Sequence, residues 1–318
     1  MDAATTPSKT PSSERRGAAL NNIAVGVDGF PEGNDAVVLG MALARVTNAE
    51  LMLVAVHSDP LVLPPLGVKW KNLRAEAQAT LQKTRTAFAP ESRIVVETDM
   101  SVPRALARVV RREHHDLLVM GSSRHAPEGR VRIGKRTRQL LGHFECPLAV
   151  APRGLHKERG VTFKRIAVGY DGGPESKAAL ELAASIAIGA GAQLNVHAVV
   201  DDRVPLTGQS TAKVAAQIAQ WEDAVTAEMD RWRKQAQTAA EATGAKFSVE
   251  VDRGRPADAL LELSEHVDLL VIGSRRWGPV ERVLLGSTGE TLLHDAACSV
   301  LVVPRPATQG SGLPRPPA

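Results

Sequence analysis

The stretch "NIAVGVDG" at residues 22–29 returns as "RIAVGYDG" at residues 165–172, and this repetition decides how the chain is organised. The two stretches are 143 residues apart. A second matching pair, "DLLVMGSSR" at 116–124 and "DLLVIGSRR" at 268–276, is offset by 152 residues. The chain therefore holds two copies of one unit of about 140 residues. The larger second offset indicates extra residues in the second copy, which we assign to residues 211–244.

Within each copy, short β-branched runs alternate with longer helical patterns, which is typical of a mostly parallel sheet covered by helices. Apolar residues at helical spacing predict helices that pack on such a sheet. In the second copy these residues are Ala179, Leu182, Ala183 and Ile186, followed by Val214, Ile218, Trp221, Val225 and Trp232. In the first copy they are Trp70, Leu73, Ala77, Leu81 and Phe88. The predicted strands of the second copy are 165–170, 193–200, 246–251, 268–272 and 299–303.

We therefore predict the α/β class, with two tandem open, mostly parallel five-stranded sheets that have helices on both faces, in a Rossmann-like arrangement. Domain 1 is predicted at 21–153, a linker at 154–163 and domain 2 at 164–305. Residues 1–20 and 306–318 are rich in Pro, Ser, Gly and charge, so both are predicted to be disordered tails that cannot offset their ordering entropy.

Length, composition and charge limit the kinds of protein that this chain can be. A chain of 318 residues suggests about two domains. No apolar run approaches the ~20 residues that a membrane helix needs, and the polar start lacks the apolar segment of a signal peptide, so we expect a cytoplasmic protein. Cys146 and Cys298 are expected to be small buried side chains rather than redox partners. A net charge of +4 does not indicate a nucleic-acid partner.

The ends of the strands supply candidate ligand-binding residues. In an open parallel sheet, ligands bind beyond the carboxyl ends of the strands, where the strand order reverses. The first strand of each copy ends at an aspartate and the fourth ends at a glycine. If these strands are neighbours, Asp171 and Gly273 border one crevice, and Asp28 and Gly121 border another.

A helix is predicted to begin near Gly286 and Ser287, directly after an arginine-rich loop. The free amide groups and the positive dipole end of a helix N-terminus suit a phosphate group. Glycine allows close approach of the backbone, and the serine hydroxyl adds a hydrogen bond. The sequence therefore predicts a phosphate-binding loop whose nucleoside end lies near Asp171.

At these residues the chain resembles the universal stress protein family, in its ATP-binding branch. The motif of that family is Gly, two residues, Gly, nine residues, then Gly followed by Ser or Thr. Domain 2 supplies Gly273, Gly286 and Ser287 at this spacing, whereas Arg276 stands where the second Gly is expected and Gly278 follows it. The resemblance covers both copies.

Domain 1 departs further from the same motif. Gly121 and Gly134 have the expected spacing, but Arg124 replaces the second Gly and Lys135 replaces Ser or Thr. By resemblance, apolar strand residues would line the base and ribose pocket. The predicted nucleotide-binding residues are Asp171, Val199, Ile272, Gly273, Arg276, Gly278, Gly286, Ser287 and Thr288 in domain 2, and Asp28, Val56, Met120, Gly121, Arg124, Gly134 and Lys135 in domain 1.

The resemblance implies a nucleotide-binding α-hydrolase-like fold and a stress-response regulatory or signalling module. Its ligand would be ATP or another adenine nucleotide, with or without magnesium, in domain 2 and as a second site in domain 1. The alternative is a nucleotide-free dimerisation and protein-interaction module, which Arg276, Arg124 and Lys135 favour. Slow ATP hydrolysis is a third option, for which no catalytic residue is predicted. The expected partners are the nucleotide and unidentified regulatory proteins, with neither membrane nor nucleic acid.

Two surface features complete the sequence-based expectations. The last strands, "PLAVAP" at 147–152 and "SVLVVP" at 299–304, are expected to pair within the chain and so cover two sheet edges, and a homodimer is a further option. A basic loop in domain 1 is read as a solvated face or a triphosphate clamp. The adjacent His114 and His115 are read as solvent-facing. The basic residues of the loop are Arg124, Arg130, Arg132, Lys135, Arg136 and Arg138.

Overall fold

The computed structural model describes residues 20–57, 73–141, 146–158, 160–201, 211–274 and 285–304, and within 211–219 it describes the backbone alone. Of the two predicted tails, Leu20 alone lies within these residues. The predicted site residues Arg276 and Gly278, and the predicted core residue Trp70, also lie outside them.

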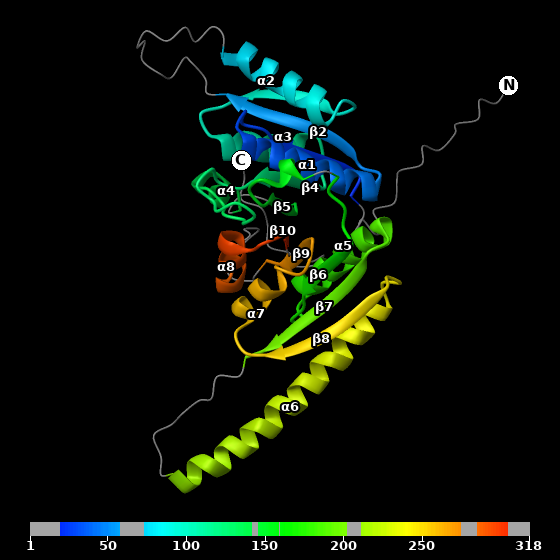
Figure 1. The fold of residues 1–318 in the computed structure, drawn as a ribbon, viewed down its shortest axis with the longest axis vertical. Coiled ribbons are helices and arrows are strands. Elements are labelled where there is room, and N and C mark those ends of the chain that lie inside the picture. Colours follow the sequence, from blue (N-terminus) through cyan, green and yellow to red (C-terminus); the bar gives the residue numbers. More distant parts are fainter. Residues whose placement is uncertain are drawn as a thin grey trace, which may run out of the picture.

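The described strands join one continuous sheet in the order β3-β2-β1-β4-β5-β10-β9-β6-β7-β8 (Figure 1). The pairings are parallel within each half, and β5 and β10 pair antiparallel at the centre, with Ala149 opposite Leu301. The predicted internal pairing of the last strands is therefore confirmed, and it merges the two five-stranded halves. The strands of domain 1 are β1 (Asn22–Gly26), β2 (Glu50–His57), β3 (Arg93–Thr98), β4 (Leu117–Gly121) and β5 (Leu148–Ala151). Those of domain 2 are β6 (Arg165–Gly169), β7 (Gln193–Val200), β8 (Phe247–Arg253), β9 (Leu269–Gly273) and β10 (Ser299–Val303).

Helices cover both faces of this sheet, and a separate layer of buried apolar side chains lies under each set. One face, called here the α1 face, carries α1 (Pro31–Thr47), α2 (Leu73–Phe88), α5 (Pro174–Ala190) and α6 (Thr211–Glu241). The other, the α3 face, carries α3 (Val102–Arg112), α4 (Lys135–Leu141), α7 (Pro256–Leu263) and α8 (Ser287–Asp295). None of the described helices is long and apolar enough to cross a membrane.

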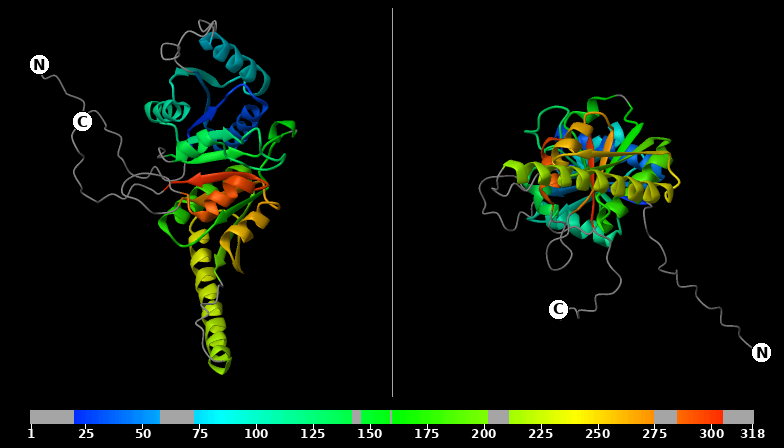
Figure 2. Two further views of the ribbon diagram at one scale, coloured as in Figure 1. Left: turned by 90° about the vertical axis from the view of Figure 1, so that its left-hand side faces the viewer. Right: turned by 90° about the horizontal axis from the view of Figure 1, so that it is seen from below.

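The predicted elements of domain 2 match the structure closely. Each predicted strand overlaps an observed one, with ends that differ by at most two residues. The helical stripe from Ala179 to Ile186 is buried. Trp221, Val225 and Trp232 of α6 pack on β7 and β8, so the expectation of core packing is confirmed for them. α6 has 31 residues, a length of about 46 Å, and extends beyond the sheet (Figures 1 and 2).

A loop of domain 1 closes the C-terminal end of a helix of domain 2. The N–H of Val131 donates to the carbonyl of Ala296 at 2.8 Å, and the N–H of Ile133 donates to the carbonyl of Leu293 at 2.9 Å. The last carbonyls of a helix have no partner within it, so these bonds satisfy groups at the end of α8. The loop is thus part of the interface between the domains.

The reading of the basic loop as a solvated face or a triphosphate clamp did not include the ion pairs that three of its arginines make. They pair with carboxylates of domain 2, which lie beside them only because the two halves form one sheet. The nitrogen–oxygen distances are 2.8 Å for Arg130 to Glu265, 3.5 Å for Arg132 to Asp295 and 3.5 Å for Arg138 to Glu290.

The two adjacent histidines differ, so their reading as solvent-facing is right for His114 and wrong for His115. His114 has φ of 53°, in the left-handed region, and this turn after α3 directs the next side chain inward. Burial lowers the pKa of His115. Cys298 is buried as expected, and burial raises the pKa of its thiol to about 12, whereas Cys146 is half-buried.

Candidate functional site

The strands that the sequence expected to be neighbours are neighbours in the sheet. β1 pairs with β4, and β6 pairs with β9, both in parallel, so the strand order reverses between these neighbours. Asp28 and Gly121 therefore lie at one carboxyl end of the sheet, and Asp171 and Gly273 lie at the equivalent end in domain 2. The structure brings together each aspartate–glycine pair that the sequence predicts.

Each aspartate also organises the turn that enters the next helix. Asp28 Oδ1 accepts a hydrogen bond from the N–H of Phe30 at 3.1 Å, and Asp171 Oδ1 accepts one from the N–H of Gly173 at 3.0 Å. Removal of water by neighbouring atoms raises the pKa of Asp28, and the charge of Glu32 adds to this rise, although the side chain keeps contact with solvent. These carboxylates thus have a structural role, whether or not a ligand is present.

Gly121 and Gly273 are required by packing between helix and strand. A Cβ atom on Gly121 would lie 2.0 Å from the carbonyl oxygen of Glu32, at the start of α1. A Cβ atom on Gly273 would lie 2.7 Å from the carbonyl carbon of Glu175, at the start of α5. Both contacts involve backbone, which cannot move aside as a side chain can. From the sequence, these glycines were expected to allow close approach of a bound anion. In the structure they also allow close packing of a helix start against a strand end.

The predicted apolar residues lie on the α3 face, on the two strands that flank β1 or β6. Met120 Sδ would lie 2.5 Å from a Cβ atom on Gly26, so Met120 fills the space above that glycine. Val56 is half-buried on the same face. In domain 2, Ile272 is buried, and Val199 on β7 is half-buried.

The first turn of α8 in domain 2 has backbone N–H groups without a side-chain cap. Gly286 precedes α8 with φ of −72° and ψ of 170°, and no side chain caps the helix. The first N–H groups of a helix have no partner within it, so those around Ser287 and Thr288 are available to an anion. A Cβ atom on Gly289 would lie 3.6 Å from Cδ1 of Ile272, which places this first turn beside β9.

The equivalent start in domain 1 is a shorter helix. α4 has seven residues and begins at Lys135, after Gly134. A Cβ atom on Gly134 would meet only the Ser123 Cβ at 3.9 Å, so the backbone there is open. Arg124 is exposed in the loop before it. The described site residues of domain 1 therefore surround one end of the sheet, with a lysine where domain 2 has a serine.

The sequence-based reading missed the residues that face Asp171 from α6. Asp171 and Gly172 line an open groove of about 630 Å³, together with side chains of that helix. The helical residues recur every three or four positions, so the spacing was the signal that could have found them. They are Arg231, Trp232, Lys234, Gln235 and Thr238.

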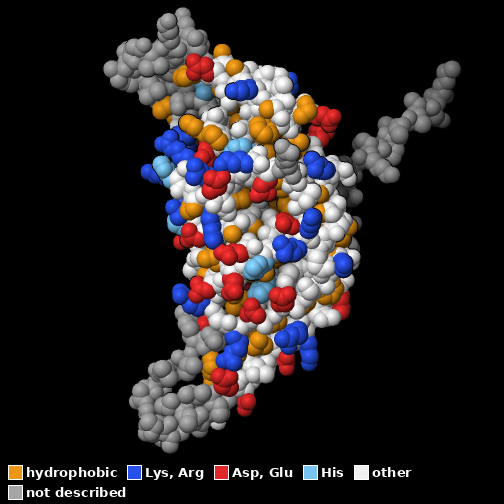
Figure 3. Space-filling view, in the orientation of Figure 1, with side chains coloured by type: hydrophobic (Ala, Val, Ile, Leu, Met, Phe, Trp, Pro, Cys, Tyr) orange, Lys and Arg blue, Asp and Glu red, His pale blue; other side chains and the backbone are white. Residues whose placement is uncertain are grey.

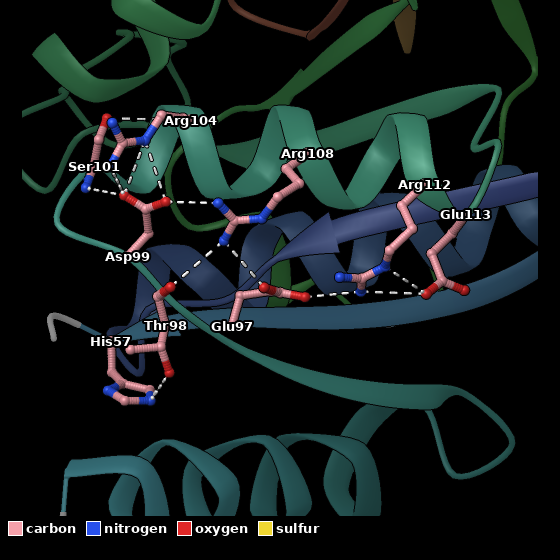
Figure 4. Close-up of polar contacts among 9 residues, drawn as sticks. All are labelled: His57, Glu97, Thr98, Asp99, Ser101, Arg104, Arg108, Arg112 and Glu113. Carbon is pink, nitrogen blue, oxygen red and sulfur yellow. Dashed lines mark hydrogen bonds and ion pairs between the residues drawn. The ribbon is translucent and has the colours of Figure 1, made fainter.

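A ladder of ion pairs closes the outer edge of domain 1 on the α3 face (Figure 4). Three arginines one helical turn apart on α3 meet two carboxylates at the end of β3. Asp99 accepts from Arg104 at 2.6 Å and from Arg108 at 2.7 Å, and its side chain is 5% exposed. Glu97 pairs with Arg108 at 3.2 Å and with Arg112 at 2.7 Å. The ladder fixes α3 on the edge strand.

Asp99→Asn is expected to lower the free energy of unfolding by about 2 kcal/mol at pH 7, because charged hydrogen bonds from two arginines are lost. The hydrogen bond from Arg104, followed by those from the Ser101 N–H and Arg108, holds the pKa of Asp99 well below its usual range. A carboxyl with a lowered folded pKa stabilises above its unfolded pKa of about 3.9 and loses that contribution as pH falls. Urea unfolding should therefore show a deficit for the variant at pH 7 that shrinks below about pH 4. A deficit that stays constant with pH would refute this assignment.

The structure is an α/β protein of two tandem doubly wound halves. An aspartate follows the first strand of each half, and a helix starts after β9. Comparison with known proteins specifies it further. The pattern described as "Universal stress protein family" matches residues 20–152 and 162–304. The chain belongs to the universal stress protein family, in a form with two such domains in tandem.

Some relatives and solved structures are similar over most of the chain, and others are similar over about half of it. Universal stress protein Rv2005c of Mycobacterium tuberculosis is 27% identical over 297 residues, which are 89% of this chain and 96% of the relative. A universal stress protein of Thermus aquaticus is 31% identical over 144 residues, 44% of this chain and 98% of the relative. The crystal structure of a universal stress protein from Archaeoglobus fulgidus is similar with a TM-score of 0.63 and 18% sequence identity. The match covers 90% of this chain and 99% of the chain in that structure, and at this identity it supports the fold alone.

Proposed function

We propose that this universal stress protein binds ATP or another adenine nucleotide in domain 2, and that it acts in the cytoplasm as a regulatory module of the stress response. The uncapped start of α8 is the observation that supports this most. Gly286, Ser287 and Thr288 present N–H groups beside β9, at the carboxyl end of the sheet. Asp171, across the β6–β9 pair, would receive the nucleoside end, and Val199 and Ile272 would contact the base and ribose.

Arg276 and Gly278, which lie outside the described residues, are proposed to close on the phosphates from the loop between β9 and α8. A guanidinium can bind phosphate oxygens through two parallel hydrogen bonds. A magnesium ion would share the phosphate charge. The domain boundaries at 21–153, 154–163 and 164–305 belong to the same proposal, with disordered tails outside them.

Domain 1 is proposed as a weaker second site. Its residues are Asp28, Val56, Met120, Gly121, Arg124, Gly134 and Lys135. A lysine is a point charge, so Lys135 can pair with a phosphate but cannot reproduce the compact hydroxyl contact of Ser287. Met120 already fills the space above Gly26, so a base would have to displace it.

The combined change Gly286→Glu and Ser287→Ala is expected to weaken ATP binding about a hundredfold, because a carboxylate at the helix start repels phosphate and the hydroxyl contact is lost. Calorimetry with ATP and magnesium measures the affinity, and acid extraction of freshly purified protein identifies any retained nucleotide. The matched control is Gly134→Glu with Lys135→Ala in domain 1, which should reduce affinity less. Equal binding by the wild type and the domain 2 variant would contradict the proposed site.

A nucleotide-free interaction module is the second candidate. It is favoured by the packing at Gly121 and Gly273, which explains these glycines without any ligand. Homodimers and regulatory proteins would then be the partners. Absence of nucleotide in the extract, together with no heat at millimolar ATP, would select this candidate.

A further inference from the structure

Three polar side chains of domain 2 occupy positions where domain 1 has apolar ones. The strand registers make the two halves comparable: Ala24 and Gly26 of β1 face two residues of β2, as Ala167 and Gly169 of β6 face two residues of β7. The next strands outward, β3 and β8, add one further pair of equivalent positions, because each contributes the residue that lies opposite the second of these residues. Met52, Val54 and Val95 in domain 1 thus correspond to Asn195, His197 and Glu250 in domain 2.

The apolar set of domain 1 packs under α3, where Met52 and Val54 are buried. In domain 2 the imidazole of His197 is equally deep, with 4% of the side chain exposed. Neither of its nitrogens makes a hydrogen bond of good geometry, although a carboxylate lies near each, and the buried Oδ1 of Asn195 has no hydrogen-bond partner among the described residues. An unpaired buried polar atom costs about 1–3 kcal/mol, so these side chains indicate a ligand that the apolar set does not need.

Two carboxylates of β8 face the two edges of this imidazole. Asp252 Oδ2 lies 3.1 Å from Nε2, and Glu250 Oε2 lies 3.6 Å from Nδ1. Their side chains are 56% and 54% exposed, so they connect the buried ring with solvent. Figure 3 shows, just below the middle of the molecule, histidine side chains with acidic side chains beside them.

Domain 1 neutralises its strand carboxylates with the arginines of α3, and the described part of domain 2 has no equivalent ladder. α7, the helix over this part of domain 2, contains Asp258 and Glu262 and no Lys or Arg. Arg255, just before it, lies 3.6 Å from Asp258. The strand residue on the other side of His197 is Gly169, which has no side chain. The charge of Glu250 and Asp252 is therefore left for a cation from solution.

We propose that His197, Asp252 and Glu250 form a site for a divalent transition-metal ion of the zinc class. Imidazole and carboxylate together suit zinc, nickel and copper, whereas magnesium prefers oxygen alone. Two ligands of one tetrahedral zinc ion, each at about 2.0–2.1 Å, lie about 3.3 Å apart. The 3.1 Å between His197 Nε2 and Asp252 Oδ2 is close to this separation.

Glu250 has a different part in the site. Its carboxylate lies 3.6 Å from Nδ1, on the side of the ring away from Asp252, and adds negative charge beside the proposed ion. No group of three or more His, Cys, Asp or Glu side chains within the described ranges could hold one ion together. His197 and Asp252 are thus the two protein ligands, and water completes the coordination.

The test uses the full chain, treated with a chelator and free of nucleotide, titrated with zinc chloride by calorimetry at pH 7. We expect one zinc ion per chain, and binding at least about 30-fold weaker in His197→Val, which restores the residue type of domain 1. Asp252→Asn, at a half-exposed position, should weaken zinc binding about tenfold. Magnesium chloride should give no comparable heat in any of these proteins.

His266→Ala is the matched control, because His266 is exposed beyond the end of α7 and should leave zinc binding unchanged. Zinc should also raise the melting temperature of the wild type but not of His197→Val. Identical zinc affinity in wild type and His197→Val, or no heat up to about 1 mM zinc, would overturn the proposal. If His197→Val does not fold, identical affinity in Asp252→Asn overturns it equally.

Discussion

Asp35→Ala is expected to lower the free energy of unfolding by about 3–5 kcal/mol, because it removes a buried charge that three donors satisfy. Asp35 lies on α1 with none of its side chain exposed. It accepts from the N–H of Gly154 at 2.9 Å, from the N–H of His156 at 2.8 Å and from the imidazole Nδ1 of His156 at 2.5 Å. These bonds attach the segment after β5 to the helix of domain 1, so their loss should release it.

Urea unfolding followed by circular dichroism at pH 7 measures this effect. Lys157→Ala is the matched control in the same segment, since Lys157 is exposed and pairs only with the exposed Glu128. Such surface pairs contribute about 0–1 kcal/mol, so the control should stay within that range. A loss of less than about 1 kcal/mol for Asp35→Ala would show that the carboxylate is not needed to hold the segment.

Gly189→Val is expected to lower the free energy of unfolding by about 3 kcal/mol through a clash between the two domains. Gly189 lies near the end of α5, where α5 crosses α1. Any Cβ atom on Gly189 would lie 1.9 Å from the carbonyl oxygen of Val46. Because this neighbour is helix backbone, the clash is relieved only if the helices separate, and the helices belong to different domains.

Thermal unfolding and hydrogen exchange together test this second prediction. The variant should melt at a lower temperature and exchange faster at the amides of β5 and β10, where the domains meet. Ile188→Ala is the control, since the neighbouring side chain is 57% exposed and its truncation should change stability by less than about 0.5 kcal/mol. Unchanged melting of Gly189→Val would mean that the helices can move apart without cost.

Much of the fold follows from patterns along the chain. The repeat at 22–29 and 165–172, the alternation of strand and helix patterns and the apolar last strands predicted the parallel halves and their internal pairing. The pairs Asp28–Gly121 and Asp171–Gly273 were also predictable, because the carboxyl ends of neighbouring parallel strands meet at one edge.

Other features depend on contacts between residues far apart in sequence. Arg130 was read as solvated, yet it pairs with Glu265 of the other domain at 2.8 Å. Asp35 resembles any helix-surface acid in the sequence, because nothing local signals the segment that covers it. His197 had no motif, since its partners are on a neighbouring strand and are found only through the register.

By itself the sequence determined the class of fold, the number of repeated units, the strands and which of them are neighbours. It could do so because hydrophobic periodicity and turn residues act over a few neighbouring positions. The tertiary structure alone decided which charges are paired, why Gly121 and Gly189 must be glycine, and where unpaired polar groups gather. Those outcomes depend on distances between segments that only the folded chain brings together.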